Sequence, residues 1–215
     1  MIRLFSAIYD DFHPFHLING VIDTAHSSNP DLLREDDVLI VWGGSDISPA
    51  LYNRGRSRYT HAMDTLSQRD RIEWDLMRRA KEIGIPIIGV CRGAQMLCAL
   101  AGGYLIQHVD NHMGMHDVLT YDNKRINVNS IHHQMLYPFE VEHEMIAWSD
   151  RIRSAVHYDV DVDVEMPIEP EFVYFPQLKG FAIQWHPEMM DENTPANRYV
   201  INYVNEKLQQ YATVD

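Results

Sequence analysis

Residues 89–93, Gly-Val-Cys-Arg-Gly, place a nucleophilic side chain between two glycines. The apolar run at residues 85–90 is typical of a strand buried on both faces of a parallel sheet. Residues 94–101 are good helix formers, and two glycines at 102–103 end that stretch. Cys91 is therefore predicted to lie at a sharp strand-to-helix turn, the nucleophile-elbow arrangement of Gly-x-Ser-x-Gly enzymes with cysteine in place of serine.

This predicted position suits attack by Cys91 on a carbonyl carbon. Free N–H groups and the dipole at a helix N-terminus stabilise negative charge on a thiolate sulfur. The backbone N–H of Arg92 is expected to stabilise the oxyanion that such an attack forms. Most free cysteines are instead small buried apolar residues, and Cys98 in the following helix fits that description. We favour the nucleophile for Cys91 because Gly-x-Cys-x-Gly at this junction has few other uses.

Residues 184–188, Gln-Trp-His-Pro-Glu, follow a second apolar strand. In an extended segment His186 and Glu188 lie on the same face, and Pro187 restricts the backbone between them. Glu188 can then orient the His186 ring while the other ring nitrogen takes the proton of Cys91. The sequence therefore predicts a triad of Cys91, His186 and Glu188.

Three histidines recur at four-residue spacing, His108, His112 and His116. On a helix they would share one face, so a metal site has to be considered. Gly114 and the Asp-Asn pair at 110–111 disfavour a continuous helix, and no fourth ligand is evident. We therefore predict a solvated or pocket-lining loop here, and we expect neither a metal nor a cofactor.

The composition excludes several classes of protein. A chain of 215 residues suits a single α/β domain over 1–215 with a sizeable core. Its formal net charge of -13 argues against direct nucleic-acid binding. Two cysteines indicate a reduced, cytoplasmic setting without a disulfide framework. We expect no membrane partner, because no apolar run approaches the ~20 residues of a membrane-spanning helix.

The order of predicted elements indicates the fold class. Strands are expected near 1–9, 38–42 and 85–90, and helices near 17–25, 64–83 and 195–211. This alternation predicts an α/β fold with a doubly wound, mostly parallel sheet. Further predicted strands, which suggest a small antiparallel β extension, cover 104–109, 125–129, 142–148, 155–164, 172–175 and 181–185.

Five blocks of the chain, in order, resemble the class I glutamine amidotransferases, and most of all their γ-glutamyl-γ-aminobutyrate hydrolase-like branch, peptidase C26. The blocks are 43–49 (Gly-Gly-Ser-Asp-Ile-Ser-Pro), 69–73 (Arg-Asp-x-x-Glu), the elbow, 128–134 (Val-Asn-Ser-Ile-His-His-Gln) and 184–188. The resemblance implies a flavodoxin-like fold. It also implies hydrolysis of a γ-glutamyl amide through a glutamyl thioester on Cys91, with His186 as acid and base.

The resemblance further implies which residues meet the substrate. The backbone N–H groups of Gly44 and Arg92 would form the oxyanion hole. The glutamyl group would be held by residues on several segments: Gly43, Gln95, Ser130, His132 and His133.

The chain also departs from the family pattern. Trp42 stands where proline is usual, and residues 50–63 form an arginine-rich loop. Arg54, Arg56 and Arg58 in that loop suit an acidic leaving amine, a partner protein, or only solvent.

Four functions are compatible with these residues. The first is a stand-alone hydrolase of a small-molecule γ-glutamyl substrate. The second is a glutaminase subunit that passes ammonia to a separate synthase partner. The third is a catalytically silent binding or regulatory module, against which the intact triad argues. The fourth is a cysteine peptidase, which residues 184–188 suit less well. The leaving amine and a homo-oligomeric state stay open.

Overall fold

A computed structural model describes residues 1–8, 11–160 and 162–213 of the chain. Its α-helices are α1 (Gln68–Ile83), α2 (Arg92–Ala101) and α3 (Pro195–Ala212). Five short 3-10 helices are η1 (Phe15–Leu17), η2 (Pro30–Leu32), η3 (Pro49–Tyr52), η4 (Pro176–Leu178) and η5 (Pro187–Met189). The strands are β1 (Ile2–Ser6), β2 (Val21–His26), β3 (Asp37–Val41), β4 (Ile87–Val90), β5 (Tyr104–Ile106), β6 (His108–Val109), β7 (Met113–Thr120), β8 (Arg125–Ile131), β9 (Met135–Tyr137), β10 (Glu144–Ser149), β11 (His157–Asp159), β12 (Val162–Asp163), β13 (Pro170–Phe175) and β14 (Gly180–Ile183).

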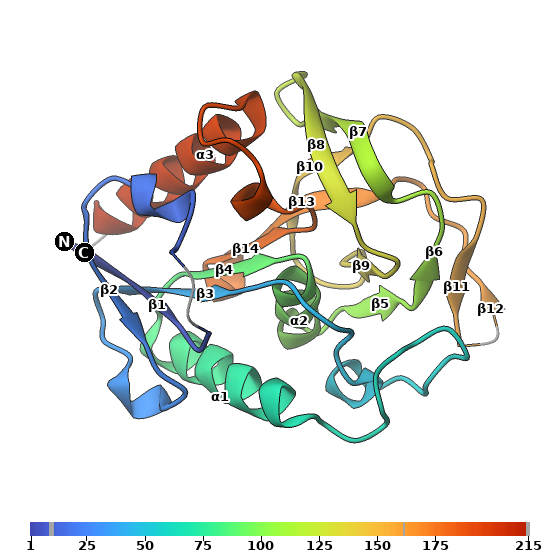
Figure 1. Cartoon of the computed structure of the whole chain (residues 1–215), viewed down its shortest axis with the longest axis horizontal. Helices are drawn as coiled ribbons and strands as arrows, with labels where there is room; N and C mark the ends of the chain where they lie inside the picture. The colour runs from blue at the N-terminus through green and yellow to red at the C-terminus, as the bar shows by residue number, and fades with distance from the viewer. Residues whose placement is uncertain (9–10, 161, 214–215) are drawn as a thin grey trace.

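One large sheet runs through the molecule in the order β2-β1-β3-β4-β14-β13-β10-β7-β8 (Figure 1). The pairings from β2 to β14 are parallel, and those from β14 to β8 are antiparallel. The predicted fold class, flavodoxin-like α/β with an antiparallel extension, is confirmed. The extension is larger than expected. Its main strands, β13, β10, β7 and β8, continue the central sheet and do not form a separate layer.

Helices cover both faces of the parallel part, as the doubly wound prediction requires. Side chains of α1 and α2 pack into one buried apolar cluster, and side chains of α3 pack into another on the opposite face. Ser67 and Asp70 form a capping box at the start of α1, and Gly84 ends that helix in the left-handed region at φ 75°. Within the described ranges, no helix is both long and apolar enough to cross a membrane.

The helix predicted over 17–25 is wrong. η1 covers only residues 15–17, and residues 21–26 form the edge strand β2, which pairs in parallel with β1. Gly20, at φ 86°, interrupts any helix there, and β-branched residues such as Val21 and Ile22 favour the strand. Residues 17–25 are therefore divided between two different elements.

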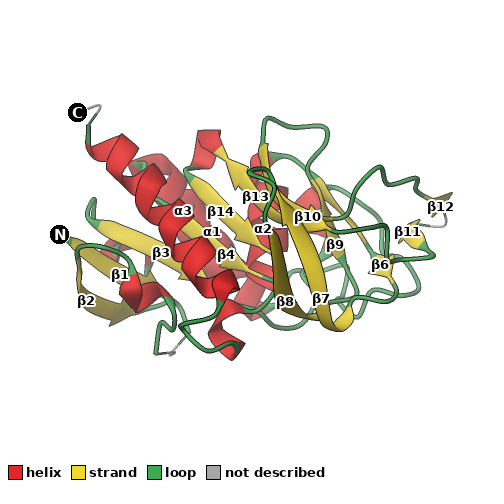
Figure 2. Ribbon diagram, turned by 90° about the horizontal axis from the view of Figure 1, so that it is seen from above, coloured by secondary structure: helices red, strands yellow, loops and turns green. Residues whose placement is uncertain are grey.

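The extension contains two further small sheets, β12-β11-β6 and β5-β9. Figure 2 shows β6, β11 and β12 at the end of the molecule away from the helices. The single strand predicted over 155–164 is in fact the antiparallel pair β11 and β12, and the one predicted over 104–109 is divided into β5 and β6. Residue 161, inside the former prediction, lies outside the described residues.

Candidate active site

The elbow forms as the glycines predict. Cys91 lies between β4 and α2 as the helix N-cap, with φ 49° and ψ -103°, a conformation rare for a residue with a side chain. Its N–H donates to the Ile183 carbonyl oxygen at 2.7 Å. A Cβ on Gly89 would collide with the backbone of Gly93, and one on Gly93 would collide with the carbonyl oxygen of Val41. Both glycines are therefore required for α2 to pack so closely against the strands.

His186 follows β14, the strand that pairs with β4 beside the elbow. Its Nδ1 lies 2.6 Å from Glu188 Oε1. Burial lowers the pKa of His186, but Cys91 and Glu188 together outweigh it and raise the pKa to about 10. The carboxylate thus holds the Nδ1 side of the ring, while His186 Nε2 forms no hydrogen bond with a described residue. The structure brings together all three residues of the predicted triad.

The site is closely enclosed. Cys91 is 6% exposed and His186 is 4% exposed. A Cβ on Gly43 would lie 2.7 Å from His186 Cε1 and 3.7 Å from Cys91 Cβ, so this glycine lies between the two side chains. Gly44 has φ 152°, and a Cβ there would collide with the Arg69 guanidinium. Both glycines permit a close approach of backbone to the site.

Asn129 on β8 supports His186 from the extension. Its Nδ2 donates to the His186 carbonyl oxygen at 2.9 Å, and its Oδ1 accepts from the His186 N–H at 3.0 Å. Gln184 approaches from β14, with its Nε2 3.9 Å from Cys91 Sγ. Both residues lie in blocks that match the family, but the sequence predicts no role for either, because only the fold brings β8 beside residue 186.

A buried ionic network connects the elbow to α1. Arg92 donates to Asp70 Oδ1 at 2.6 Å and to Glu73, both on α1. Arg69, one turn before Glu73, donates to it at 3.0 Å and also to the Gly43 carbonyl oxygen at 2.8 Å. The block at 69–73 therefore links α1 to both glycine-containing turns. The sequence does not predict this role, because nothing in it shows that Arg92 faces the acidic residues of this block.

The predicted glutamyl-binding side chains are mostly engaged within the protein. Gln95 Nε2 donates to the Gln134 carbonyl oxygen at 3.1 Å. Ser130 Oγ donates to the His112 carbonyl oxygen at 2.6 Å, and the Ser130 side chain is buried. His132 Nδ1 donates to Gln134 O at 2.9 Å. Gly43, described above, is the member of this set that lies against the triad.

His133, by contrast, faces a surface pocket. Its Nε2 is 2.9 Å from Asp46 Oδ1, and Asp46 also accepts from the His61 N–H at 2.8 Å. Burial raises the pKa of Asp46, but the contacts with His133 and His61 outweigh it and lower that pKa. The pocket has a volume of about 480 Å³ and is lined by residues of the arginine-rich loop and by histidines: Arg56, Arg58, Tyr59, Thr60, His61, His108 and His133.

The histidines at 108, 112 and 116 do not share one environment. His108 stacks on Tyr59 at a centroid distance of 4.4 Å in that pocket. His112 and His116 are buried, and His116 lies within β7. The predicted solvated or pocket-lining loop is therefore wrong for these two, because the alternation of β7 turns residue 116 toward the interior.

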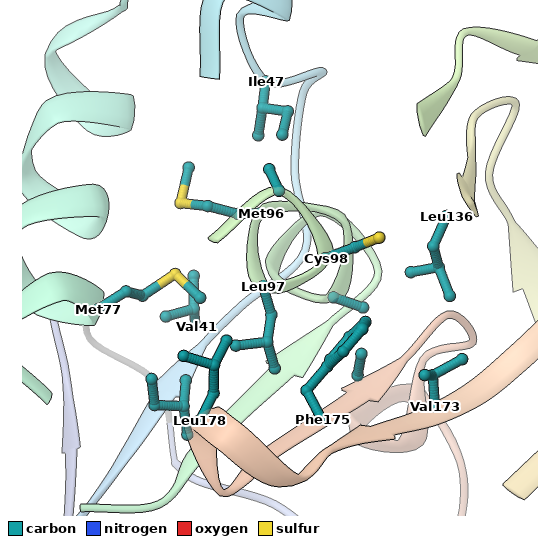
Figure 3. Close-up of a cluster of buried hydrophobic side chains, with 14 of the residues drawn as sticks. Val41, Ile47, Met77, Met96, Leu97, Cys98, Leu136, Val173, Phe175 and Leu178 are labelled. Atoms are coloured by element: carbon teal, nitrogen blue, oxygen red, sulfur yellow. The ribbon is translucent and has the colours of Figure 1, made fainter. Parts of the chain in front are cut away.

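Trp42 is also buried, against the rings of Phe12 and Phe15 at centroid distances of 6.2 Å and 5.7 Å. It packs the N-terminal loop onto the end of β3. The second cysteine, Cys98, lies among apolar side chains of α2 and its neighbours (Figure 3). Burial raises its pKa to about 12, as expected of a cysteine that only packs.

The fold and the elbow define a class of α/β protein. Its cysteine, Cys91, lies at the strand-to-helix turn after β4, and its histidine, His186, follows β14, the parallel neighbour of β4. The sequence profile of the Peptidase C26 family matches residues 21–122. The chain is 30% identical to "Putative glutamine amidotransferase Rv2859c" of Mycobacterium tuberculosis over 70% of its own length and 50% of that protein. The chain thus spans about half the length of that relative.

Solved structures share the fold. A "putative gmp synthase subunit a protein" from Thermoplasma acidophilum superposes with a TM-score of 0.66 at 15% identity, over 100% of this chain and 97% of that one. The CTPS glutaminase domain of Trypanosoma brucei superposes with a TM-score of 0.57 at 14% identity, over 96% and 94%. The chain is thus related to the class I glutamine amidotransferases, and its residues 21–122 match the family model of peptidase C26.

Proposed function

We propose that this protein hydrolyses a γ-glutamyl amide through a glutamyl thioester on Cys91. The observation that carries the proposal is geometric: Cys91 lies at a strained strand-to-helix turn, Gly43 is close to both Cys91 and the His186 ring, and that ring is held by Glu188 at 2.6 Å. With the pKa of His186 raised, the state in which the ring holds the thiol proton is favoured. The sulfur is then ready to attack.

The reaction proceeds in two halves. The Cys91 sulfur attacks the γ-carbonyl carbon, and the N–H groups of Arg92 and Gly44 stabilise the oxyanion. His186 gives its proton to the leaving nitrogen as the carbon–nitrogen bond breaks, which releases ammonia or an amine. Water then loses a proton to His186 and attacks the thioester, the carbon–sulfur bond breaks, and glutamate leaves. Glu188 holds the imidazolium in place throughout.

The leaving group on the nitrogen distinguishes the candidate substrates. The pocket beside Asp46 carries Arg56 and Arg58, which suit an amine that bears a carboxylate or another anionic group. Purified protein should therefore release glutamate from γ-glutamyl amides with acidic amines faster than from those with neutral amines. L-glutamine, γ-glutamyl-alkylamines and γ-glutamyl-amino acids form the test panel. Cys91→Ala is the inactive control.

A second function is a glutaminase subunit that delivers ammonia to a synthase. It is favoured by the enclosed thiol, which fits a site that opens only with a partner, and by the synthase named for the Thermoplasma acidophilum neighbour. Acivicin, which is bound in the CTPS glutaminase domain, separates the two functions. Labelling of Cys91 by acivicin without release of glutamate from any amide would favour the partner-dependent subunit. Neither labelling nor release would contradict both.

A further inference from the structure

A cluster of imidazole and carboxylate side chains is buried in the β extension, outside the candidate triad. It consists of six residues that come together from four segments: His112, His116, His132, His157, Glu169 and Glu171. We propose that His112, His116 and Glu171 bind one divalent transition-metal ion of the zinc type. The site is independent of the proposed amide hydrolysis.

The ligand atoms are already gathered. His116 Nε2 lies 2.9 Å from Glu171 Oε1, and His112 Nδ1 lies 3.4 Å from the same oxygen. One ligand atom from each of the three residues lies within 4.8 Å of the other two. In a tetrahedral zinc site with ligand bonds near 2.1 Å, neighbouring ligand atoms are about 3.4 Å apart. Small side-chain adjustments would therefore suffice to close the three ligands around an ion.

Buried polar atoms in the cluster lack hydrogen bonds. Among the described residues, none forms a hydrogen bond to either ring nitrogen of His112, to His132 Nε2 or to Glu171 Oε2. The side chains of His112 and Glu171 are 0% exposed, so these atoms have no contact with surface solvent. Buried polar atoms without partners are rare in proteins, and each one calls for an explanation. A bound cation supplies a partner for several of them at once.

Glu169 lies beside the proposed ligand His112, where its carboxylate can orient the imidazole ring. Its Oε2 is 3.2 Å from His112 Nε2, although the two are not aligned as a hydrogen bond. Its other oxygen, Oε1, lies 2.9 Å from His157 Nε2 and accepts from the Ser154 N–H at 2.8 Å. With a metal on His112 Nδ1, the Nε2–H would donate to Glu169, the pairing that orients most metal-bound histidines. Two buried carboxylates also balance the charge of one divalent ion.

His132 is placed to complete the coordination. Its Nδ1–H donates to the Gln134 carbonyl oxygen, which leaves the lone pair of the neutral ring on Nε2. That nitrogen lies 3.9 Å from Glu171 Oε1, so it faces the cluster. The His112 and His132 rings have centroids 4.7 Å apart. Three imidazoles and one carboxylate form a donor set that zinc accepts, whereas magnesium and calcium prefer oxygen ligands.

The position of the cluster gives the ion a structural role. His112 and His116 flank the start of β7, His132 follows β8, and Glu171 lies in β13. The Glu171 carbonyl oxygen accepts from the Gln184 N–H at 2.8 Å, two residues before His186. An ion here would therefore link three segments of the extension directly behind the candidate active site.

The direct test is calorimetric titration of Zn²⁺ into chelator-treated, dialysed protein. A Cys91→Ala background prevents binding by the thiol and His186. We expect one ion per chain, and a higher melting temperature when the ion is bound. His116→Gln and Glu171→Gln should each weaken binding more than about 100-fold. The matched control His108→Gln, from the same histidine series but outside the cluster, should bind like its parent. No saturable binding, or unchanged binding in folded His116→Gln and Glu171→Gln proteins, would overturn the proposal.

A second measurement does not require the ligand variants His116→Gln and Glu171→Gln. X-ray absorption at the zinc edge of the loaded Cys91→Ala protein should show a first shell of imidazole nitrogen and carboxylate oxygen. A sulfur ligand would assign the ion to Cys98, and a shell of water oxygens alone would indicate surface binding. Either result would contradict the proposed site.

Discussion

Asn129 holds the backbone of His186 from both sides, donating to its carbonyl oxygen at 2.9 Å and accepting from its N–H at 3.0 Å. The contact joins β8 of the antiparallel extension to the segment that follows β14 of the parallel sheet. The extension therefore positions the histidine on which the proposed chemistry depends, although it contributes no residue to the triad.

Replacing Asn129 by alanine should lower kcat for amide hydrolysis about 10- to 100-fold, because the imidazole would lose its fixed position beside Cys91. The unpaired backbone groups of His186 should also reduce the free energy of unfolding by about 1–3 kcal/mol. Asn127→Ala is the matched control, since Asn127 lies two residues earlier on the same strand and its exposed amide donates to Asp117 Oδ1 at 2.8 Å, away from His186. Equal activity of the two variants would show that the two hydrogen bonds from Asn129 do not influence His186.

Glu188→Gln should reduce kcat by about 10²- to 10⁴-fold, since an amide cannot stabilise the imidazolium. It should also change the pH profile. Burial lowers the pKa of His186, but Cys91 and Glu188 together raise it to about 10, so the ring stays protonated until the pH rises through that value. Without the carboxylate the pKa falls, and the alkaline limb of the pH–rate profile should move to lower pH. An unchanged limb would mean that His186 does not protonate the leaving group.

Gly93→Ala should lower the free energy of unfolding by about 2 kcal/mol or more, because its Cβ would collide with the Val41 carbonyl oxygen. Gly55→Ala serves as the control: of the described residues, a Cβ there would meet Val160 alone, at an ordinary contact distance of 3.6 Å. That change should stay within about 0.5 kcal/mol of the parent. Urea denaturation of both variants measures the difference. Similar midpoints would show that α2 can move away from β3 at little cost.

Glu73→Ala should cost about 3–5 kcal/mol of unfolding free energy, because it removes a partner of the buried Arg92 and of Arg69. Glu82→Ala on the same helix removes an exposed carboxylate paired with Arg79 at 3.5 Å, and it should change stability by less than about 1 kcal/mol. Thermal unfolding of the two proteins tests the contrast. A small loss for Glu73→Ala would mean that the network does not hold the elbow.

The sequence was most informative where a local pattern dictates a local geometry. The elbow glycines, the strand before Cys91 and the Pro187 segment could be predicted because each depends on residues a few positions apart. Contacts between distant segments could not. No pattern in the chain reveals that Asn129 meets His186, that Arg92 meets Glu73, or that His112 and His116 turn inward toward Glu171. The edge strand β2 was missed because its apolar residues fit a helical spacing equally well.

The measurement closest to the central claim is identification of the covalent intermediate. Rapidly quenched reactions with a γ-glutamyl amide would be digested and the cysteine-containing peptides analysed by mass spectrometry. We expect a glutamyl adduct on Cys91, absent in Cys91→Ala and retained in Cys98→Ala, since Cys98 is buried in the apolar core. Glutamate release that persists in Cys91→Ala, or an adduct on any other residue, would contradict the proposed mechanism.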